Sequence, residues 1–463
     1  MTEVCRQRGL LNPPNERCRI GAIGYRNQEM RCARKCFPQL IVDHREQRGT
    51  EFSSDGRQDE FLHPLSVFSV PPWFRPKSHK TRCGGFIAEL SVARNMTHVL
   101  ETGFEQMDAT NPNGSPKIRG YNIINGEISL SSDGATFESH NPALFADCLG
   151  EFPLSTKEDV HTALAAARAA FPAWAATPAP TRGQIIGNMG RLLMEYKDDI
   201  VRVETREIGK TLKESAGSVQ EAIDTCHFFQ SEGRRLYGQT VNSELPDKEL
   251  FTYRRPLGVC GIINACNFPA AVPFWKMIPA IMCGNTCVWK SPQDAPLLSF
   301  MLTRIMHEAG LPDGVINLVH GKGGGAGQDL VDAVDLGMIN KISFTGSTAV
   351  GKMIGEICGR NLVSVSLELG GKNPLVIMPS ANMENAVEGA YWSAFGTAGQ
   401  RCTSLGNLII HEDIYDEFVE RLMAKVESTT IGDSMVQENV LYGPMLSERY
   451  AKDFLRDVQM CET

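Results

Sequence analysis

The pattern of apolar positions becomes regular beyond about residue 250. Short apolar runs there alternate with amphipathic stretches such as residues 298–309. The runs are residues 259–263, 286–289, 315–319 and 341–344. Continuous apolar runs of this length are typical of strands buried on both faces, and their alternation with helices predicts a parallel sheet covered by helices on both sides. In such sheets ligands bind at the carboxyl ends of the strands.

Between residues 116 and 250 the pattern predicts a strand and then several helices. Residues 121–127 are typical of a strand followed by a turn. Residues 155–158 match a capping box at the start of a helix. Four apolar residues share one face of that helix: Val160, Leu164, Ala167 and Phe171. More helix is expected from Arg182 to about Tyr237.

Residues 1–115 differ from the rest of the chain, because Pro, Arg, Cys and Ser are spread through them and no period persists. We expect an unstructured extension here in preference to a regulatory arm, with Met96 or Met107 as an alternative starting residue. Cys32 and Cys36 have ligand-like spacing, but no second Cys/His pair follows them. No metal site is therefore expected.

Composition narrows the class of protein. The chain has 463 residues, of which 42% are hydrophobic and 22% charged, so two or three globular domains are expected. No apolar run approaches the ~18 residues of a membrane span. The start of the chain does not resemble a signal peptide, and the 14 cysteines are scattered, which favours the reducing cytoplasm. The net charge of −8 argues against nucleic acid as a partner.

Two residues could carry covalent chemistry. Cys402 lies in the glycine-containing segment 395–403, and Glu368 begins the segment Glu-Leu-Gly-Gly-Lys, 34 residues upstream of it. A thiolate is a strong nucleophile where a base or a polar setting activates it, and a carboxylate can act as the base. The pair therefore predicts acyl chemistry.

Polar residues follow two of the predicted strands. Asn267 could donate a hydrogen bond to a developing oxyanion, although an Asn that only forms a turn is the alternative. Lys290 ends the next strand, where a cation could meet a ribose or a phosphate, or could simply be solvated.

Glycines mark two possible phosphate contacts. Gly321, Gly323 and Gly327 form a pattern looser than the dinucleotide-binding fingerprint. Gly346 and Ser347 lie between a strand and a helix, where backbone N–H groups could bind a pyrophosphate. An ordinary turn capped by Ser347 is the alternative.

From about residue 120 to the end, these segments resemble the NAD(P)-dependent aldehyde dehydrogenases in their order, their residues and their spacing. They include Asn-Phe-Pro at 267–269, Phe-Thr-Gly-Ser-Thr at 344–348 and Gly-Gln-Arg-Cys at 399–402. The resemblance implies an α/β fold with a parallel Rossmann-type cofactor sheet. It assigns residues 116–370 to an NAD(P)-binding domain, with an oligomerisation hairpin near 249–258, and residues 371–463 to a partial α/β catalytic domain.

The resemblance also implies roles for single residues. Cys402 would attack an aldehyde, and Asn267 and the Cys402 backbone N–H would hold the oxyanion. Hydride transfer to NAD or NADP would leave a thioester, which water activated by Glu368 would hydrolyse. Lys276 matches a lysine of the family's proton relay. At Gln293 many NAD-preferring relatives have a Glu that holds the adenosine ribose, so the chain could accept either cofactor.

The chain stops at Thr463, 61 residues after Cys402, without the Glu-x-Phe-Gly-Pro segment or the partner-pairing strand of the family. We therefore expect a chain truncated at its C-terminus. The resemblance implies homo-oligomers for full-length members of the family and makes one doubtful for this chain.

Arg401 is the one clue to the substrate. It could pair with a carboxylate at the far end of a semialdehyde, or it could be structural. The main hypothesis is a hydrolytic dehydrogenase of such aldehydes. The alternatives are a CoA-acylating semialdehyde dehydrogenase, which Glu368 speaks against, and a non-catalytic fragment that binds a nucleotide or a partner.

Overall fold

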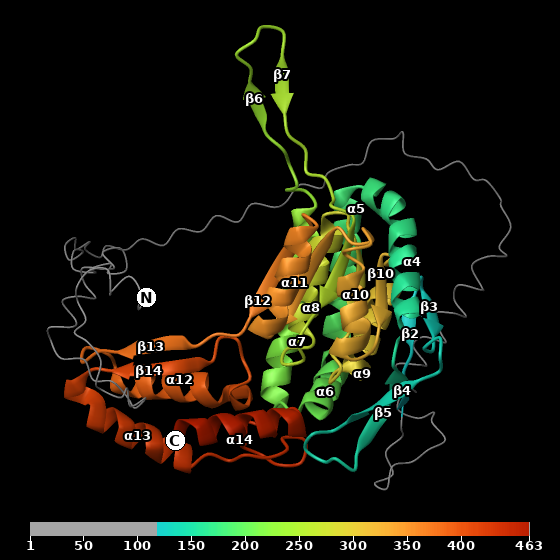
Figure 1. Cartoon of the computed structure of the whole chain (residues 1–463). Coiled ribbons are helices and arrows are strands. Elements are labelled where there is room, and N and C mark those ends of the chain that lie inside the picture. Colours follow the sequence, from blue (N-terminus) through green and yellow to red (C-terminus); the bar gives the residue numbers. More distant parts are fainter. Residues whose placement is uncertain (1–117, 463) are drawn as a thin grey trace, which may run out of the picture. The chain divides into compact units, whose positions relative to one another are not determined.

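The computed structural model describes residues 118–462 (Figure 1). The predicted extension over residues 1–115 and the Cys32–Cys36 pair lie outside them. Within 118–462, none of the helices is long and apolar enough to cross a membrane.

A seven-stranded sheet forms the centre of the described chain. Its strand order is β12-β11-β8-β9-β10-β2-β3. The strands are β2 (Asn122–Ile124), β3 (Glu127–Ser129), β8 (Val259–Ile263), β9 (Thr286–Lys290), β10 (Ile316–Val319), β11 (Lys341–Gly346) and β12 (Ser364–Leu369). The five strands from β12 to β10 are parallel, as predicted. The strand and turn predicted at 121–127 add an antiparallel hairpin at one edge, so the sheet is mixed.

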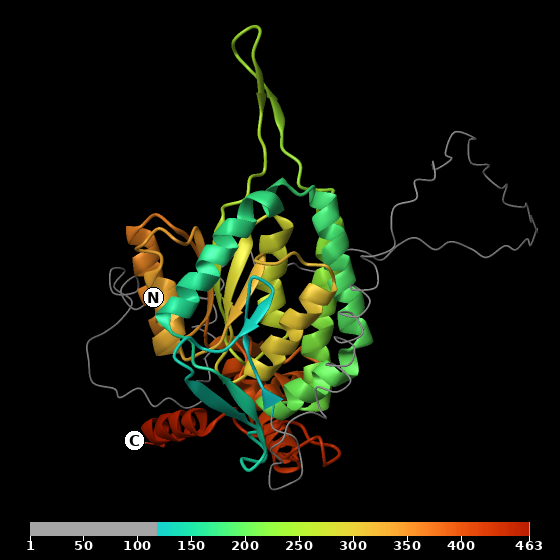
Figure 2. The ribbon, with the colours of Figure 1, turned by 90° about the vertical axis from the view of Figure 1, so that its right-hand side faces the viewer.

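Helices cover both faces of this sheet, which confirms the doubly wound prediction. In β8, Cys260 and Ile262 pack into one core with the helices of residues 271–282 and 296–308, whereas Val259 and Ile263 pack into a second core with the helices of residues 157–176 and 348–360. Figure 2 shows the two layers of helices on either side of the strands. The helices around the sheet are α4 (Lys157–Ala176), α8 (Ala271–Met282), α9 (Pro296–Glu308), α10 (Gln328–Asp332) and α11 (Thr348–Arg360).

The helical region before the sheet divides into three further helices. They are α5 (Ala179–Glu195), α6 (Lys197–Ile208) and α7 (Leu212–Glu232). The predicted capping box of α4 is correct in kind but displaced by one residue, because Thr156 and Asp159 form it. Ser155 instead donates its hydroxyl hydrogen to the Oδ1 of Asn122 in β2, at 3.0 Å. A second capping box, formed by Thr211 and Glu214, begins α7.

A two-stranded hairpin projects between α7 and β8. It consists of β6 (Thr240–Asn242) and β7 (Glu249–Phe251), and all six strand residues are exposed. The predicted range of 249–258 therefore included only the second strand. Strands without a buried face give no alternating pattern, which explains the displacement.

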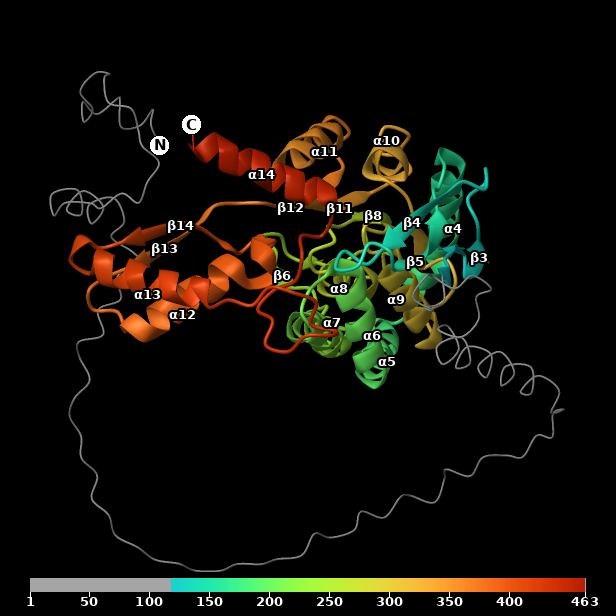
Figure 3. The same cartoon turned by 90° about the horizontal axis from the view of Figure 1, so that it is seen from below.

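The chain leaves the main sheet after β12 and forms a second, parallel sheet from β13 (Asn373–Ile377) and β14 (Leu405–Ile410). Two helices, α12 (Met383–Phe395) and α13 (Tyr415–Glu427), pack on it around Ile377, Ile410 and Phe418. Figure 3 shows these elements together.

The remaining elements are a small sheet and the last described helix. The sheet has the order β1-β5-β4, from β1 (Ile118–Arg119), β4 (Thr136–His140) and β5 (Cys148–Pro153). The helix is α14 (Glu448–Glu462), and Leu446, two residues before it, packs with Cys266 and Ala295.

Candidate active site

A cleft of about 1940 Å³ runs along one side of β8, β11 and β12 and past their carboxyl ends. It brings together seven of the predicted site residues: Asn267, Lys276, Gly346, Ser347, Glu368, Arg401 and Cys402. Five predicted cofactor residues do not line it: Lys290, Gln293, Gly321, Gly323 and Gly327. The structure thus gathers the residues expected to perform chemistry and places most of the expected cofactor contacts elsewhere.

Cys402 presents an exposed thiol to this cleft. Of the eight cysteines whose side chains the structure describes, only Cys283 is also exposed. The backbone at Cys402 is fixed by Asn373. Its Nδ2 donates to the carbonyl oxygens of Cys402, at 2.7 Å, and Ser404, at 2.9 Å. A free, accessible thiol on a fixed backbone is what a nucleophile requires.

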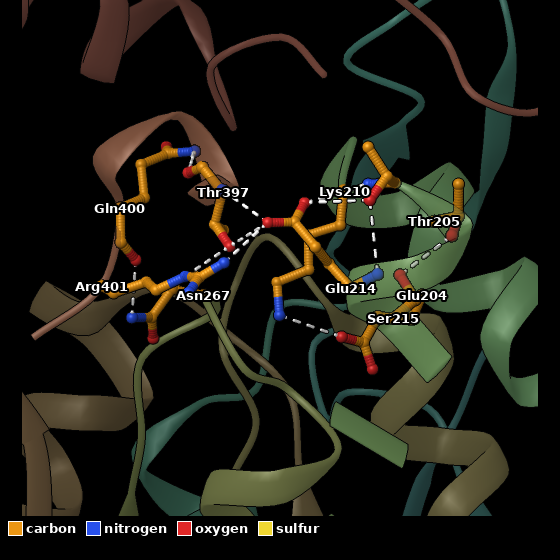
Figure 4. A network of polar contacts seen from close by, with 10 residues as sticks. Glu204, Thr205, Lys210, Glu214, Ser215, Asn267, Thr397, Gln400 and Arg401 are labelled. Carbon is orange, nitrogen blue, oxygen red and sulfur yellow. Dashed lines mark hydrogen bonds and ion pairs between the residues drawn. The ribbon is translucent and has the colours of Figure 1, made fainter. Parts of the chain in front are cut away.

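The segment before Cys402 has an unusual backbone. Thr397, Ala398 and Gly399 have successive φ angles of 55°, 52° and 71°. This left-handed region suits glycine but is uncommon for the other two residues. The Thr397 N–H donates to the Oε1 of Glu214, at 2.6 Å, and the Thr397 hydroxyl donates to the same oxygen, at 2.9 Å (Figure 4).

The side chain of Arg401 reaches toward α7, which also lines the cleft. Its Nη2 donates to the Oε1 of Glu214 at 2.8 Å, its Nε donates to the Thr397 hydroxyl at 2.9 Å, and its guanidinium lies over the ring of Trp392. Of the two interpretations of Arg401, this geometry fits the structural one. Sequence reasoning missed Glu214, although its capping-box pattern with Thr211 was a local signal that could have placed it at the start of a helix.

Asn267 lies against the segment that carries Cys402. Its Nδ2 donates to the carbonyl oxygen of Gln400 at 2.9 Å (Figure 4), and its Oδ1 is buried without a partner among the described residues. The NH₂ group has a second hydrogen, which this bond leaves available. The side chain is therefore fixed two residues from the thiol with one donor to spare.

Glu368 lies on the exposed side of β12, which alternates with the half-buried Leu367 and Leu369. The charge of Glu368 acts on Lys276, whose Nζ donates to the Ser343 hydroxyl at 3.1 Å. Burial lowers the pKa of Lys276 to about 8, and the charge of Glu368 acts in the opposite direction. A base and an amine with a pKa near neutrality thus share one wall of the cleft.

The end of β11 provides a possible phosphate contact. A Cβ on Gly346 would come within 2.4 Å of the Phe344 ring, so the backbone approaches the cleft where only glycine fits without displacing that ring. The Ser347 hydroxyl caps α11 by accepting from the Val350 N–H, at 3.4 Å. The buried hydroxyl of Thr345 has no partner among residues 118–462. This orphaned donor and the N-terminus of α11 fit a dinucleotide phosphate.

The other predicted cofactor residues do not line the cleft. The side chain of Lys290 passes close to Gly327, because a Cβ added to that glycine would lie 3.4 Å from the Lys290 Cδ. Burial lowers the pKa of Lys290 to about 8. Gly321 has a φ of 141°, and Gly323 begins a single irregular helical turn. Gln293 is half-buried and bonds to Asp294.

Comparison with known proteins gives a consistent result. The model of the aldehyde dehydrogenase family matches residues 129–461. An alpha-ketoglutarate semialdehyde dehydrogenase of Haloferax volcanii is 38% identical over 343 residues, which are 74% of this chain and 70% of that protein. An NADP-dependent succinate-semialdehyde dehydrogenase of Escherichia coli is 37% identical over 73% of this chain and 69% of its own length.

Solved structures agree with these relatives. A crystal structure of an NADP-dependent enzyme of Escherichia coli has a TM-score of 0.71 and 35% identity, and the match covers 74% of this chain and 70% of that one. The NAD⁺ complex of an aldehyde dehydrogenase from Bacillus cereus has a TM-score of 0.71 and 30% identity, with 74% and 69% covered.

Proposed function

The chain belongs to the aldehyde dehydrogenase family, and from this premise we propose that it oxidises a carboxylate-bearing aldehyde to the acid with NAD or NADP. The relatives named for alpha-ketoglutarate, succinate and glutarate semialdehydes support this class of substrate. The observation that carries the proposal is that the exposed Cys402 thiol, Glu368 and the fixed Asn267 amide all line one cleft.

In the proposed reaction, the Cys402 thiolate attacks the carbonyl carbon of the aldehyde and forms a thiohemiacetal. The spare N–H of Asn267 and the backbone N–H of Cys402 stabilise the oxyanion, an effect worth ~3–4 kcal/mol per donor in a preorganised site. NAD(P), when bound, would supply the hydride acceptor, and loss of hydride from the thiohemiacetal would leave a thioester on Cys402. Glu368 then removes a proton from water, which attacks the thioester and releases the acid and the thiol.

Lys276 contributes through its neutral form. Because its pKa is about 8, a substantial fraction of the amine is unprotonated in mildly alkaline solution. We propose that it accepts the proton from Glu368, in agreement with the electrostatic effect of Glu368 on Lys276.

For the cofactor we propose that the α11 N-terminus, with Gly346 and Ser347, holds the pyrophosphate. Lys290 would hold the ribose, with Gly321, Gly323 and Gly327 permitting close approach of the backbone. The amide at Gln293 does not repel a 2′-phosphate as a carboxylate would, so both NAD and NADP are accepted.

Glu368 in the cleft favours hydrolysis of the thioester over its transfer to CoA, because hydrolysis needs a base for water. We also propose that the protein acts in the reducing cytoplasm, in keeping with the eight free thiols described. Self-association would use the exposed β6–β7 hairpin, which carries Val241, Leu250 and Phe251 on its surface.

The proposal is tested by incubating the protein with succinate semialdehyde and either cofactor, and by following the absorbance of the reduced nicotinamide. We expect turnover with both cofactors and a higher kcat/KM for succinate semialdehyde than for butanal. Equal kcat/KM values for the two aldehydes would contradict the carboxylate-bearing substrate. Reduced-cofactor formation only in the presence of CoA would replace hydrolysis with acyl transfer.

A further inference from the structure

The left-handed backbone before Cys402 needs support from its surroundings. Two adjacent non-glycine residues, Thr397 and Ala398, adopt φ angles of 55° and 52°. Such conformations persist where neighbouring groups fix them, and they cluster at sites where a side chain must be aimed. Residues 397 and 398 must therefore be held by contacts with other parts of the chain.

Glu214 supplies most of the support. One carboxylate oxygen, Oε1, accepts from the Thr397 N–H at 2.6 Å, from the Thr397 hydroxyl at 2.9 Å and from the Arg401 Nη2 at 2.8 Å (Figure 4). The side chain of Glu214 is 3% exposed and that of Arg401 is 16% exposed. Charge-assisted hydrogen bonds in so little solvent are stronger than neutral ones. A single oxygen therefore fixes both ends of the segment 397–401.

Glu214 is itself fixed by the start of α7. Its second oxygen, Oε2, accepts from the Thr211 hydroxyl at 3.1 Å and from the Thr211 N–H at 3.4 Å, which completes the capping box. One oxygen faces the helix and the other faces the loop. The carboxylate cannot turn toward solvent without breaking bonds on both sides.

A second anchor holds the neighbouring residue. The carbonyl of Gln400 accepts from the Asn267 amide at 2.9 Å, and the Gln400 Oε1 accepts from the Leu446 N–H at 3.2 Å. Gln400 and Arg401 are thus held from different elements, and Cys402 follows them directly. The direction of the thiol depends on both anchors.

We propose that Glu214 is a positioning residue for the nucleophile, which holds the segment 397–401 so that the Cys402 thiol points into the cleft. The inference rests on the proposed function, in which Cys402 attacks the aldehyde. Glu214 acts through Thr397 and Arg401 and touches no reacting atom. A displacement of the reacting atom by about 1 Å is enough to slow a reaction by about 100-fold.

The test is Glu214→Gln, which keeps the shape of the side chain but removes the charge and replaces one acceptor oxygen with a donor. We expect kcat to fall about 30-fold while the KM for the aldehyde changes less than about threefold, because binding is retained and alignment is lost. Alkylation of Cys402 by iodoacetamide, followed on its peptide by mass spectrometry, should slow about tenfold. Peptide detection is needed because Cys283 is also exposed.

The matched control is Glu207→Gln. Glu207 is a buried carboxylate on the neighbouring α6 whose two oxygens accept from the N–H groups of Leu297 and Leu298, both at 2.8 Å. Its loss should lower the melting temperature as much as Glu214→Gln does, but leave kcat and the alkylation rate within about twofold. Equal losses of kcat in both variants would reduce Glu214 to a stabilising residue and overturn the proposal.

A second variant keeps the proposal testable if Glu214→Gln does not fold. Thr397→Ala retains Glu214 and removes only the hydroxyl bonds, and we expect kcat to fall about fivefold; an unchanged kcat would overturn the proposal. Cys402→Ala measured in parallel separates the two claims. If Cys402→Ala is active, the proposed function fails; if it is inactive while Glu214→Gln keeps the wild-type kcat, only the positioning role fails.

Discussion

The two walls of the cleft hold their groups in different ways. Cys402 follows a strained loop that is fixed by one buried carboxylate, Glu214, which reaches it from α7. Glu368 lies on the exposed face of β12, the edge strand of the main sheet, and the pairing of β12 with β11 sets its position. The comparison indicates that the nucleophile depends on long-range polar contacts, whereas the base depends on strand register. Substitutions near the two groups should therefore fail in different ways.

The largest effect is expected from Cys402→Ala, which removes the nucleophile itself. Turnover should fall by roughly 10⁴-fold or more, since no other described thiol lies at that point of the cleft. Steady-state formation of reduced cofactor is the measurement. Cys283→Ala, at the other exposed cysteine, is the control and should change kcat by less than about twofold. Turnover that survives Cys402→Ala would remove the basis of the comparison.

Asn267→Ala should reduce kcat by about 10²–10³-fold, because an oxyanion donor and the anchor of Gln400 are lost together. Asn264→Ala is the control. The Oδ1 of Asn264 accepts from the Trp289 indole N–H at 2.6 Å, so this change should lower stability and leave kcat nearly unchanged. A kcat for Asn267→Ala within threefold of the wild type would argue that Asn267 only forms a turn.

Arg401→Ala distinguishes the two interpretations of that side chain. If Arg401 is structural, the buried Glu214 loses its cation, and the free energy of unfolding should fall by about 2–3 kcal/mol. The ratio of kcat/KM values for succinate semialdehyde and butanal should stay the same. Denaturant titration and the two kinetic assays measure these quantities. A collapse of the ratio in a protein of unchanged stability would instead make Arg401 the substrate's carboxylate partner.

The smallest effect concerns Lys276 on the opposite wall. Burial lowers its pKa from 10.5 to about 8, so between these pH values the unfolded chain binds more protons than the folded one. Stability should therefore rise with pH across this window, by about 1–2 kcal/mol after solvent screening of a partly exposed ammonium is allowed for. Lys276→Met should remove this rise. Lys352→Met, at an exposed residue of α11, should leave it in place, and a rise that survives Lys276→Met would refute the assignment.

The buried strands were predicted well, because short continuous apolar runs such as 259–263 usually form strands that are buried on both faces. It displaced the capping box of α4 by one residue, since Ser155 and Thr156 both precede an acidic residue at the required spacing. Only the cross-strand bond from Ser155 to Asn122 decides between them. The hairpin of residues 240–251 was misplaced because its exposed strands carry no alternating pattern.

The candidate site was likewise only partly predictable from the sequence. Short motifs located Cys402 and Glu368, and the structure places both in one cleft. They could not locate Glu214, which contacts Thr397 across 183 residues of sequence. The ion pair of Arg401 was equally hidden, because its partner lies on α7 and not in its own motif. Contacts between segments far apart in the chain become visible only when the fold is known.

The most direct test of the two-wall account is to trap the acyl group on Cys402 in Glu368→Gln. This variant keeps the nucleophile wall intact and removes only the base, so the thioester should form and then persist. After mixing with aldehyde and NAD(P), we predict one burst of reduced cofactor and an acyl adduct, by mass spectrometry, on the peptide that contains Cys402. Normal steady-state turnover, or an adduct on another residue, would contradict the account.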